Sequence, residues 1–202
     1  MMVSTLDNDP NNDPGSRVPP GQFLVEKFPV LSYGPTPRFD PATWEFRLFG
    51  LVEKPLRLNY QQFCALSKIQ LTADFHCVTT WSRLDNVWEG VSAQLVVNLV
   101  RPNPEACWVL IHCNGGYTTN LSLADFLDDD VIFAQRHDGQ DIDPDHGWPL
   151  RLVVPKLYAW KSAKWVCGVE FLAEDRRGFW EVRGYHKRGD PWAEERYSDQ
   201  EE

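Results

Sequence analysis

Residues 75–91, FHCVTTWSRLDNVWEGV, place a single cysteine between a histidine and a run of polar residues. Residues 70–77 follow a strand pattern, so Cys77 is predicted to stand where a strand passes into a loop. Side chains at such positions are often displayed to a ligand. A neighbouring His76 or Arg83 would favour the thiolate, which binds metals and attacks electrophiles. This stretch leaves three roles open for Cys77: core packing, nucleophile or metal ligand.

The rest of the chain reads as strands joined by short helices. Strands are predicted over residues 44–52, 70–77, 108–113, 131–135, 151–154 and 165–172. Asn59 with Gln62 fits a capping box that opens a helix, and Ser92 can cap a second helix. Ser122 with Asp125 indicates a third short helix. The sum predicts the α+β class, a mostly β, mixed-sheet domain with short helices.

Length and composition indicate one globular domain between two tails. The chain has 202 residues, of which 43% are hydrophobic, with nine tryptophans. Such a composition can bury a core of its own. Residues 1–22, rich in Asp, Asn, Pro and Gly, are predicted to be a disordered or draped tail. Residues 23–195 form the predicted domain and 196–202 an acidic tail, although Trp192 and Tyr197 could anchor the end of the chain.

The charge pattern excludes some classes of partner. The formal net charge is −9, whereas nucleic acid binding requires a concentrated basic face. No apolar run reaches the length of a transmembrane helix. The N-terminal residues lack the basic and apolar regions of a secretion signal, so a cytoplasmic location is expected. The five cysteines contain no C-x-x-C pair, which argues against a zinc knuckle.

Two further stretches suggest ligand binding. Residues 146–169, HGWPLRLVVPKLYAWKSAKWVCGV, contain four basic residues and no acid. They could hold a phosphate or a similar anion, or form a solvated basic turn. In residues 112–121, HCNGGYTTNL, a glycine pair precedes Tyr117. This pair allows a close backbone approach to a ligand, or makes a plain hairpin turn.

Together these blocks resemble one family, the molybdopterin-binding domain of sulfite-oxidase-like oxidoreductases. The resemblance covers most of residues 25–195. It is carried by KFPVLSYGPTPRFDPATWEFRLFGLVEKP (27–55), HCVTTW (76–81), GYTTNL (116–121), HGWPLRLVVPKLYAWKSAKWV (146–166) and FLAEDRRGFWEVRGYHKRGDPW (171–192).

The resemblance implies a molybdenum–molybdopterin cofactor with Cys77 as the protein's sulfur ligand to the metal. A soft thiolate suits a metal that is already bound by sulfur. The implied cofactor-binding residues are Cys77, Thr118, Thr119, His146, Arg151, Ser162, Ala163 and Lys164. The implied catalytic residues are Cys77, Tyr117 and His76, with Trp81 and Arg83 as further candidates for the substrate face. Residues 28–34 are expected to cover the pterin.

The implied reaction is oxygen-atom transfer on a small sulfur- or nitrogen-oxide substrate, with electrons exchanged with a separate protein. His76 occupies a place where relatives often have arginine, which argues against sulfite as the substrate. We also expect no dimerisation or haem-binding domain, and no export signal like that of periplasmic relatives that reduce methionine sulfoxide.

Two other hypotheses stay open. The chain could be a non-catalytic molybdopterin- or ligand-binding module of the same fold, because a fold does not fix a function. It could also be a cysteine hydrolase with Cys77 as nucleophile and a distant histidine as base.

Overall fold

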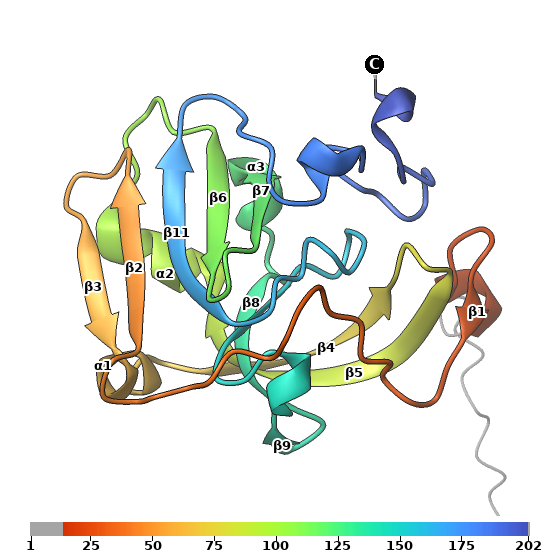
Figure 1. Ribbon diagram of the computed structural model, residues 1–202, viewed down its shortest axis with the longest axis horizontal. Coiled ribbons are helices and arrows are strands. Elements are labelled where there is room, and N and C mark those ends of the chain that lie inside the picture. The colour runs from red at the N-terminus through yellow and green to blue at the C-terminus, as the bar shows by residue number, and fades with distance from the viewer. Residues whose placement is uncertain (1–13, 202) are drawn as a thin grey trace, which may run out of the picture.

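The strand-rich sequence forms two β-sheets in the computed structural model, which describes residues 14–201 (Figure 1). The first sheet has the order β3-β2-β11-β6-β7, with β11 parallel to β2 and antiparallel to β6. Its strands are β2 (Glu45–Gly50), β3 (Leu56–Asn59), β6 (Trp108–Cys113), β7 (Thr118–Ser122) and β11 (Val166–Leu172).

The second sheet is built around the long strand β5 (Trp81–Ser92). On one side β5 pairs with the antiparallel strand β4 (Ile69–His76). On the other side it pairs with β1 (Phe23–Leu24), which is parallel, and with β8 (Ile132–His137), which is antiparallel. Strand β8 also pairs with β9 (Gln140–Asp141) and β10 (Arg151–Val153). In Figure 1 β4 and β5 run beneath the upright first sheet.

Each predicted helix begins at its predicted cap. The Asn59 side chain accepts a hydrogen bond from the Gln62 backbone and begins α1 (Tyr60–Cys64). Ser92 caps α2 (Ala93–Val100), and Ser122 caps α3 (Leu123–Phe126). Four short 3-10 helices complete the described elements: η2 (Pro14–Arg17), η3 (Pro144–His146), η4 (Glu181–Arg183) and η5 (Ser198–Gln200). The predicted α+β class with mixed sheets and short helices is confirmed.

Strand β5 was not predicted, because its sequence carries polar residues where a half-buried strand alternates apolar and polar ones. The structure shows why a polar side chain is tolerated there. Asn86 is fully buried, and its side-chain amide donates to the backbone carbonyls of Ala73 and Arg83. A buried amide that is hydrogen-bonded in this way costs little, so the strand does not need an apolar residue at that position.

The core joins the two sheets through aromatic rings. Phe46 of β2 and Phe133 of β8 are fully buried, with ring centroids 5.3 Å apart at 76°. Phe63 of α1 packs on Phe46 at 5.0 Å. Such edge-to-face pairs add to the stabilisation that burial itself provides. The contact fixes the second sheet, and the loops at its ends, against the first.

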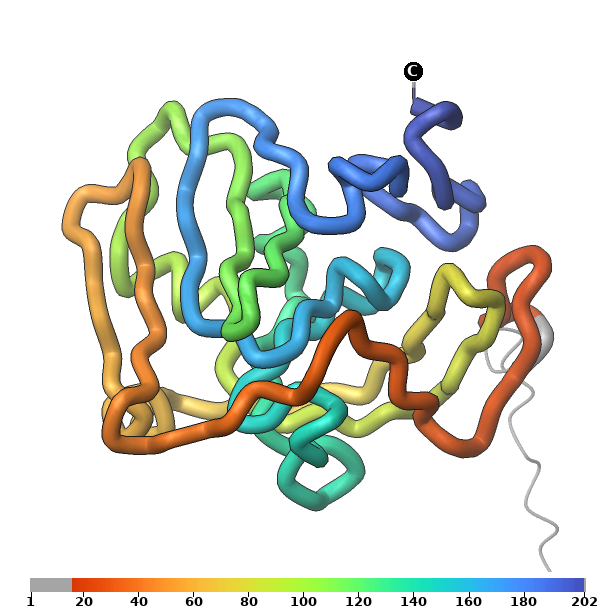
Figure 2. Tube along the Cα trace, in the orientation of Figure 1, coloured from red at the N-terminus to blue at the C-terminus, as the bar shows by residue number. Residues whose placement is uncertain are grey.

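The segments outside the sheets also contact the domain. The Arg17 guanidinium forms ion pairs with Asp74 and Asp85. The N-terminal arm then crosses the front of the molecule in Figure 2. Near the other end, Glu201 accepts a hydrogen bond from the backbone of Lys187. Residues 1–13 of the predicted tail, and residue 202, lie outside the described residues, and the boundaries at residues 23 and 195 stay predictions.

No helix within residues 14–201 combines the length and the apolar character that a bilayer crossing requires.

Replacing Phe46 with alanine should lower the free energy of unfolding by about 3–5 kcal/mol, because the cavity would lie between the two sheets. Urea unfolding followed by tryptophan fluorescence measures the change. Leu99 of α2 is 40% exposed, so Leu99→Ala is the control and should stay within about 0.5 kcal/mol of the unsubstituted protein. Equal losses in the two variants would contradict the proposed position of the core.

Candidate functional site

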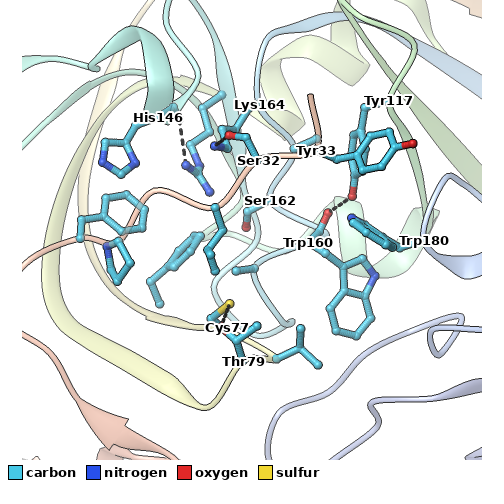
Figure 3. A pocket seen from close by; sticks show the side chains of 18 of the residues that line it. Ser32, Tyr33, Cys77, Thr79, Tyr117, His146, Trp160, Ser162, Lys164 and Trp180 are labelled. Carbon is cyan, nitrogen blue, oxygen red and sulfur yellow. Dashed lines mark hydrogen bonds between the residues drawn. The ribbon is translucent and has the colours of Figure 1, made fainter. Parts of the chain in front are cut away.

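A cavity of about 350 Å³ lies beside the loop that joins β4 to β5 (Figure 3). Segments far apart in the chain form its wall. They come from the N-terminal arm (28–33), the end of β4 and the following loop (75–81), residues 159–165 and residues 180–185. Tyr117, His146 and Arg151 complete the lining. A cavity of this volume suits a small-molecule ligand or cofactor.

Cys77 begins the tight turn between β4 and β5. Its backbone N–H donates to the carbonyl of Trp81 at 2.8 Å, and its carbonyl accepts from the N–H of Thr80 at 2.9 Å. Thr80 has a φ of 74°, a left-handed conformation that β-branched residues rarely adopt. Such strain persists only where the surrounding structure enforces it, and it is common at functional sites.

Three distant segments hold this turn in place. Gln22 donates through its side-chain amide to the carbonyl of Cys77 at 3.2 Å. Arg196 donates to the carbonyl of Val78 at 2.5 Å. The backbone N–H of Ala159 donates to the carbonyl of His76, the residue before Cys77, at 2.8 Å. The turn is therefore fixed from outside as well as by its own hydrogen bonds.

Cys77 lines the cavity, and the residue is 5% exposed. Its sulfur lies 3.1 Å from the hydroxyl of Thr79. Burial raises the thiol pKa, while Thr79 and the charges of Arg151 and Arg196 act in the opposite direction. A metal ion binding here would therefore displace a proton. The hydrogen-bond partner of this sulfur is the hydroxyl of Thr79, and no histidine within residues 14–201 forms a hydrogen bond with it.

His76 lies outside the cavity lining that the described residues form. The residue is 5% exposed, and its Nδ1 lies 2.9 Å from the hydroxyl of Ser82. Burial lowers the pKa of His76 to about 4, so the imidazole is neutral near pH 7. Arg83 also lies outside this lining and pairs with Asp138. Of the predicted substrate-face residues, Trp81 and Tyr117 line the cavity.

Arg151 supplies a buried positive charge to the cavity. Its guanidinium lies over the rings of Phe28, Phe75 and Trp88, at 5.2, 4.9 and 6.0 Å from their centroids. One terminal nitrogen donates to the carbonyl of His146 at 2.8 Å, but Nε is buried without a partner. Burial lowers the pKa of Arg151 to about 10, so it stays charged at neutral pH.

Arg151 is buried, with 4% of its surface exposed, yet no carboxylate within residues 14–201 forms an ion pair with it. Leaving a buried charge unpaired costs several kcal/mol, at an order of magnitude. An anionic ligand in the cavity would supply the missing partner.

Two further basic residues gather beside this guanidinium. Lys164 donates to the hydroxyl of Ser32 at 2.6 Å and to the carbonyl of Asp145 at 2.7 Å. Burial, and then the charge of Arg151, lower the pKa of Lys164 to about 7. The ring of His146 lies near both, and burial lowers its pKa as well.

A glycine lets these basic residues approach one another. Gly147 has a φ of 120°, and a Cβ atom there would lie 3.1 Å from the Cβ of Lys164 and 3.2 Å from that of Arg151. A larger residue would be strained in its backbone and would push the two cations apart.

Residues of the N-terminal arm line the cavity, and their expected role of covering the pterin stays a prediction. Phe28 stacks on His146 with ring centroids 4.4 Å apart, and Ser32 accepts the hydrogen bond from Lys164. Further along, Tyr33 packs on Phe179 at 4.6 Å. Residues from this arm therefore contact both the basic side and the aromatic side of the cavity.

Ser162 and Ala163 line the cavity, but their backbone N–H groups are already used. They donate within the loop to the carbonyls of Ala159 and Lys161. The hydroxyl of Ser162 accepts from the backbone of Val154 at 2.9 Å. In this structure the loop is therefore held by its own hydrogen bonds, and Lys164 contributes a side-chain cation.

The aromatic side of the cavity contains Tyr117, Trp160 and Trp180 (Figure 3). The phenol of Tyr117 donates to the carbonyl of Trp160 at 2.5 Å. Burial raises its pKa well above the ordinary value, so the phenol keeps its proton. Thr118 and Thr119, which were predicted to line the pocket, lie on β7 outside the described lining, and Thr119 donates to Glu181.

A buried ion pair supports this side. Lys161 and Glu181 have fully buried side chains, with Nζ and Oε1 2.6 Å apart. Lys161 also donates to the backbone and side-chain oxygens of Asn120, and Trp160 donates to Glu181 at 3.0 Å. The sequence had grouped Lys161 with anion-binding residues, whereas its charge is matched inside the protein. No sequence pattern had marked Glu181.

The chemistry of this cavity fits a molybdopterin. It combines one thiol, an unpartnered buried guanidinium for a phosphate, and rings that can pack on an organic group. Within the described residues no group of three or more His, Cys, Asp and Glu side chains could hold a metal ion. A metal held by Cys77 would therefore take its other ligands from a non-protein group, as a dithiolene provides.

Comparisons with known proteins agree with this chemistry. The family described as the oxidoreductase molybdopterin binding domain matches residues 33–180. The uncharacterized oxidoreductase YuiH of Bacillus subtilis is 45% identical over 188 residues, which are 93% of this chain and 95% of that protein. The sulfite oxidase of Arabidopsis thaliana is 28% identical, and the matched region spans 86% of this chain and 55% of that protein.

Two further matches cover only part of the other protein. The catalytic subunit MsrP of the protein-methionine-sulfoxide reductase of Campylobacter jejuni is 28% identical, over 79% of this chain and 59% of that protein. The sulfane dehydrogenase SoxCD of Paracoccus pantotrophus has a similar fold, with a TM-score of 0.63 at 19% identity over 86% of this chain and 56% of that one.

Sulfate should bind the cofactor-free protein more weakly as the solution changes from about pH 6 to about pH 8.5, because a lysine with a lowered pKa loses its charge in that range. Lys164, with a pKa of about 7, is charged below that pH and neutral above it. We expect the dissociation constant to rise by about 10-fold, measured by calorimetry at constant ionic strength. Sulfate itself keeps its charge throughout.

The Lys164→Met variant should bind sulfate weakly, with a dissociation constant that does not change with pH. Lys156 lies outside the cavity lining and pairs with Asp125 and Asp128, so Lys156→Met should retain the pH dependence. A pH dependence that survives in Lys164→Met would assign the titration to another group.

Proposed function

The chain belongs to the family of molybdopterin-binding oxidoreductase domains, and from this premise we propose that it catalyses oxygen-atom transfer on a small sulfur- or nitrogen-oxide substrate. The observation that carries the proposal is that the thiol of Cys77 and the unpaired guanidinium of Arg151 line the same cavity. A metal ligand and a phosphate partner at one cavity are what a molybdenum–molybdopterin cofactor requires.

In this proposal Cys77 binds the metal, while Arg151 and Lys164 bind the phosphate of the pterin. His146 and Phe28, stacked on each other, form the adjoining wall. The bound cofactor supplies a two-electron redox centre that accepts or gives one oxygen atom. The net reaction is XO + 2e⁻ + 2H⁺ → X + H₂O, or its reverse, with electrons from or to a separate protein.

The protein's own residues set the substrate's position. The turn of residues 77–81 holds the thiol, and Tyr117, Trp160 and Trp180 form the aromatic wall opposite the basic side (Figure 3). Because the phenol of Tyr117 keeps its proton and donates a hydrogen bond to the carbonyl of Trp160, its proposed role is to shape this wall. The Lys161–Glu181 pair fixes the segments that carry the two tryptophans.

The distribution of charge in the cavity favours a neutral substrate. In this proposal both cations of the described lining, Arg151 and Lys164, are engaged by the cofactor. The aromatic wall and Thr79 offer no positive charge to a sulfite or nitrate ion. An anion that is moved out of water needs such a partner, whereas a neutral S-oxide or N-oxide does not. MsrP, named as a methionine-sulfoxide reductase, gives one example of such a substrate among the relatives.

Cys77→Ser should lower turnover with a viologen or dye electron partner by at least about 100-fold, because the loss of a direct metal ligand exceeds the 10–100-fold effect typical of outer contacts. The protein would be expressed in a host that makes the cofactor. Molybdenum and pterin content are measured beside activity. Cys107 is exposed, so Cys107→Ser is the matched control and should keep both metal and turnover.

Metal-free protein from a competent host would contradict cofactor binding. Stoichiometric cofactor without turnover on any substrate of a broad panel would favour the non-catalytic binding module instead.

A neutral alkyl sulfoxide or amine N-oxide should be turned over with a kcat/KM at least about 10-fold above that for sulfite or nitrate. The reason is that an anion without a cationic partner in the aromatic half of the cavity should lower kcat/KM by about 10-fold or more. Dye-linked steady-state assays at constant ionic strength give the ratio. A preference for the anions would show that a cation reaches the reacting atom, and would refute the proposed substrate class.

A further inference from the structure

The side chain of Thr79 is directed at the sulfur of Cys77 (Figure 3). Its Oγ1 lies 3.1 Å from Sγ, and among the residues that the structure describes this hydroxyl has no other hydrogen-bond partner. Thr79 is exposed and lines the cavity. Most side-chain hydroxyls bond to water or to a backbone group instead. Because the residue is exposed, the fold does not need this contact for burial, and a role toward the sulfur has to be considered.

The backbone of the turn fixes Thr79 beside the thiol. The N–H of Thr80 donates to the carbonyl of Cys77 at 2.9 Å, which closes a four-residue turn with Thr79 in the third position. The hydroxyl of Thr80 donates to the carbonyl of Thr79 at 2.6 Å. The carbonyl of Val78 accepts from Arg196. Three successive carbonyls are therefore engaged, so the backbone that carries both the sulfur and the hydroxyl has little freedom.

The protonation state of the sulfur decides which atom donates. A thiol can donate or accept a hydrogen bond, whereas a thiolate has no proton and can only accept. The metal-binding form of cysteine is the thiolate. With a metal on Cys77, the hydroxyl of Thr79 is therefore the donor, and such a bond to an ionised group is stronger than one between neutral groups.

The other charges near this sulfur have partners of their own. Burial raises the thiol pKa, and the hydroxyl and backbone N–H of Thr79, followed by the charges of Arg151 and Arg196, lower it. In the proposed function Arg151 is paired with the phosphate of the cofactor. Arg196 lies 3.7 Å from the carboxylate of Glu194. Thr79 is thus the residue that acts on the sulfur directly.

A hydrogen bond to a metal-bound sulfur changes how readily the metal takes up an electron. The bond draws negative charge toward the donor proton, so the sulfur gives less of it to the metal. The reduced metal, which carries more electron density, is then stabilised more than the oxidised metal. Reduction potentials of thiolate-bound metals accordingly depend on the hydrogen bonds to the sulfur.

We propose that Thr79 raises the reduction potential of the metal bound by Cys77, through the hydrogen bond that its hydroxyl donates to the sulfur. This inference rests on the proposed function. Thr79 is a positioning residue in this role, because it acts on the metal through the ligand and does not itself contact the metal. Groups in this outer position commonly adjust the properties of a metal site.

The test compares Thr79→Val with Thr79→Ser in the holoenzyme. Valine has the shape of threonine without the hydroxyl, whereas serine keeps the hydroxyl. Each protein is titrated anaerobically with redox mediators, and electron paramagnetic resonance of the one-electron-reduced metal gives the midpoint potentials. In Thr79→Val the equilibrium constant for one-electron reduction should fall by about 10-fold, which lowers the potential by about 59 mV. Thr79→Ser should have the potentials of the unsubstituted enzyme.

Thr72→Val is the matched control, because Thr72 is an exposed threonine of β4 that lies outside the described cavity lining. Its potentials should equal those of the unsubstituted enzyme. Three results would overturn the proposal: unchanged or higher potentials in Thr79→Val, the same fall in Thr79→Ser as in Thr79→Val, or an equal fall in Thr72→Val.

Molybdenum content separates this inference from the proposed function. All variants keep Cys77, so each should contain as much molybdenum as the unsubstituted enzyme. If the unsubstituted protein from a competent host lacks the metal, the proposed function fails. If Thr79→Val alone loses the metal, the hydroxyl serves to retain the cofactor, and its role in setting the potential is refuted. Full metal content with equal potentials in every protein refutes this inference and leaves the proposed function intact.

Discussion

Two buried cations ten residues apart decide what this domain can do. Lys161 is enclosed by a carboxylate and by the oxygens of Asn120, so its charge is balanced inside the protein. Arg151 is equally buried but lies among aromatic rings, with one nitrogen that has no partner. The charge of the first cation is matched by Glu181, whereas the second has no ion-pair partner within residues 14–201.

The thiol and the guanidinium are brought together by long-range contacts. Cys77 stands at the end of a strand in one part of the chain, while Arg151 begins β10 some seventy positions later. The pairing of β5 with β8, and of β8 with β10, sets their separation. The fold therefore creates the site by sheet register, and each loop only refines the position of its own residue.

Local signals in the sequence predicted much of the secondary structure. The helix caps at Asn59, Ser92 and Ser122 involve residues three positions apart, so they can be recognised without knowledge of the fold. The strand at residues 108–113 is a buried apolar run. Strand β5 could not be recognised because its polar residues are satisfied by distant partners. The family resemblance, rather than any residue pattern, predicted the cofactor.

The candidate site was predictable only for those residues that lie in locally distinctive stretches of sequence. Cys77, His146, Arg151 and Lys164 stand out in unusual stretches and do line one cavity. Glu181 and Gln22 carry no local signal, because each acts through a contact with a residue far away in the chain. Thr119 was assigned to the pocket by the family resemblance, whereas its hydroxyl donates a hydrogen bond to Glu181.

The turn of residues 77–81 is clasped by Gln22 from near one end of the described chain and by Arg196 from near the other. During synthesis on the ribosome, the first of these residues emerges long before the second. Both hydrogen bonds to the turn cannot be present together until residue 196 has left the exit tunnel. The turn that carries Cys77 is therefore held from both sides only in the completed chain, so a chain truncated before residue 196 would lack one of these contacts.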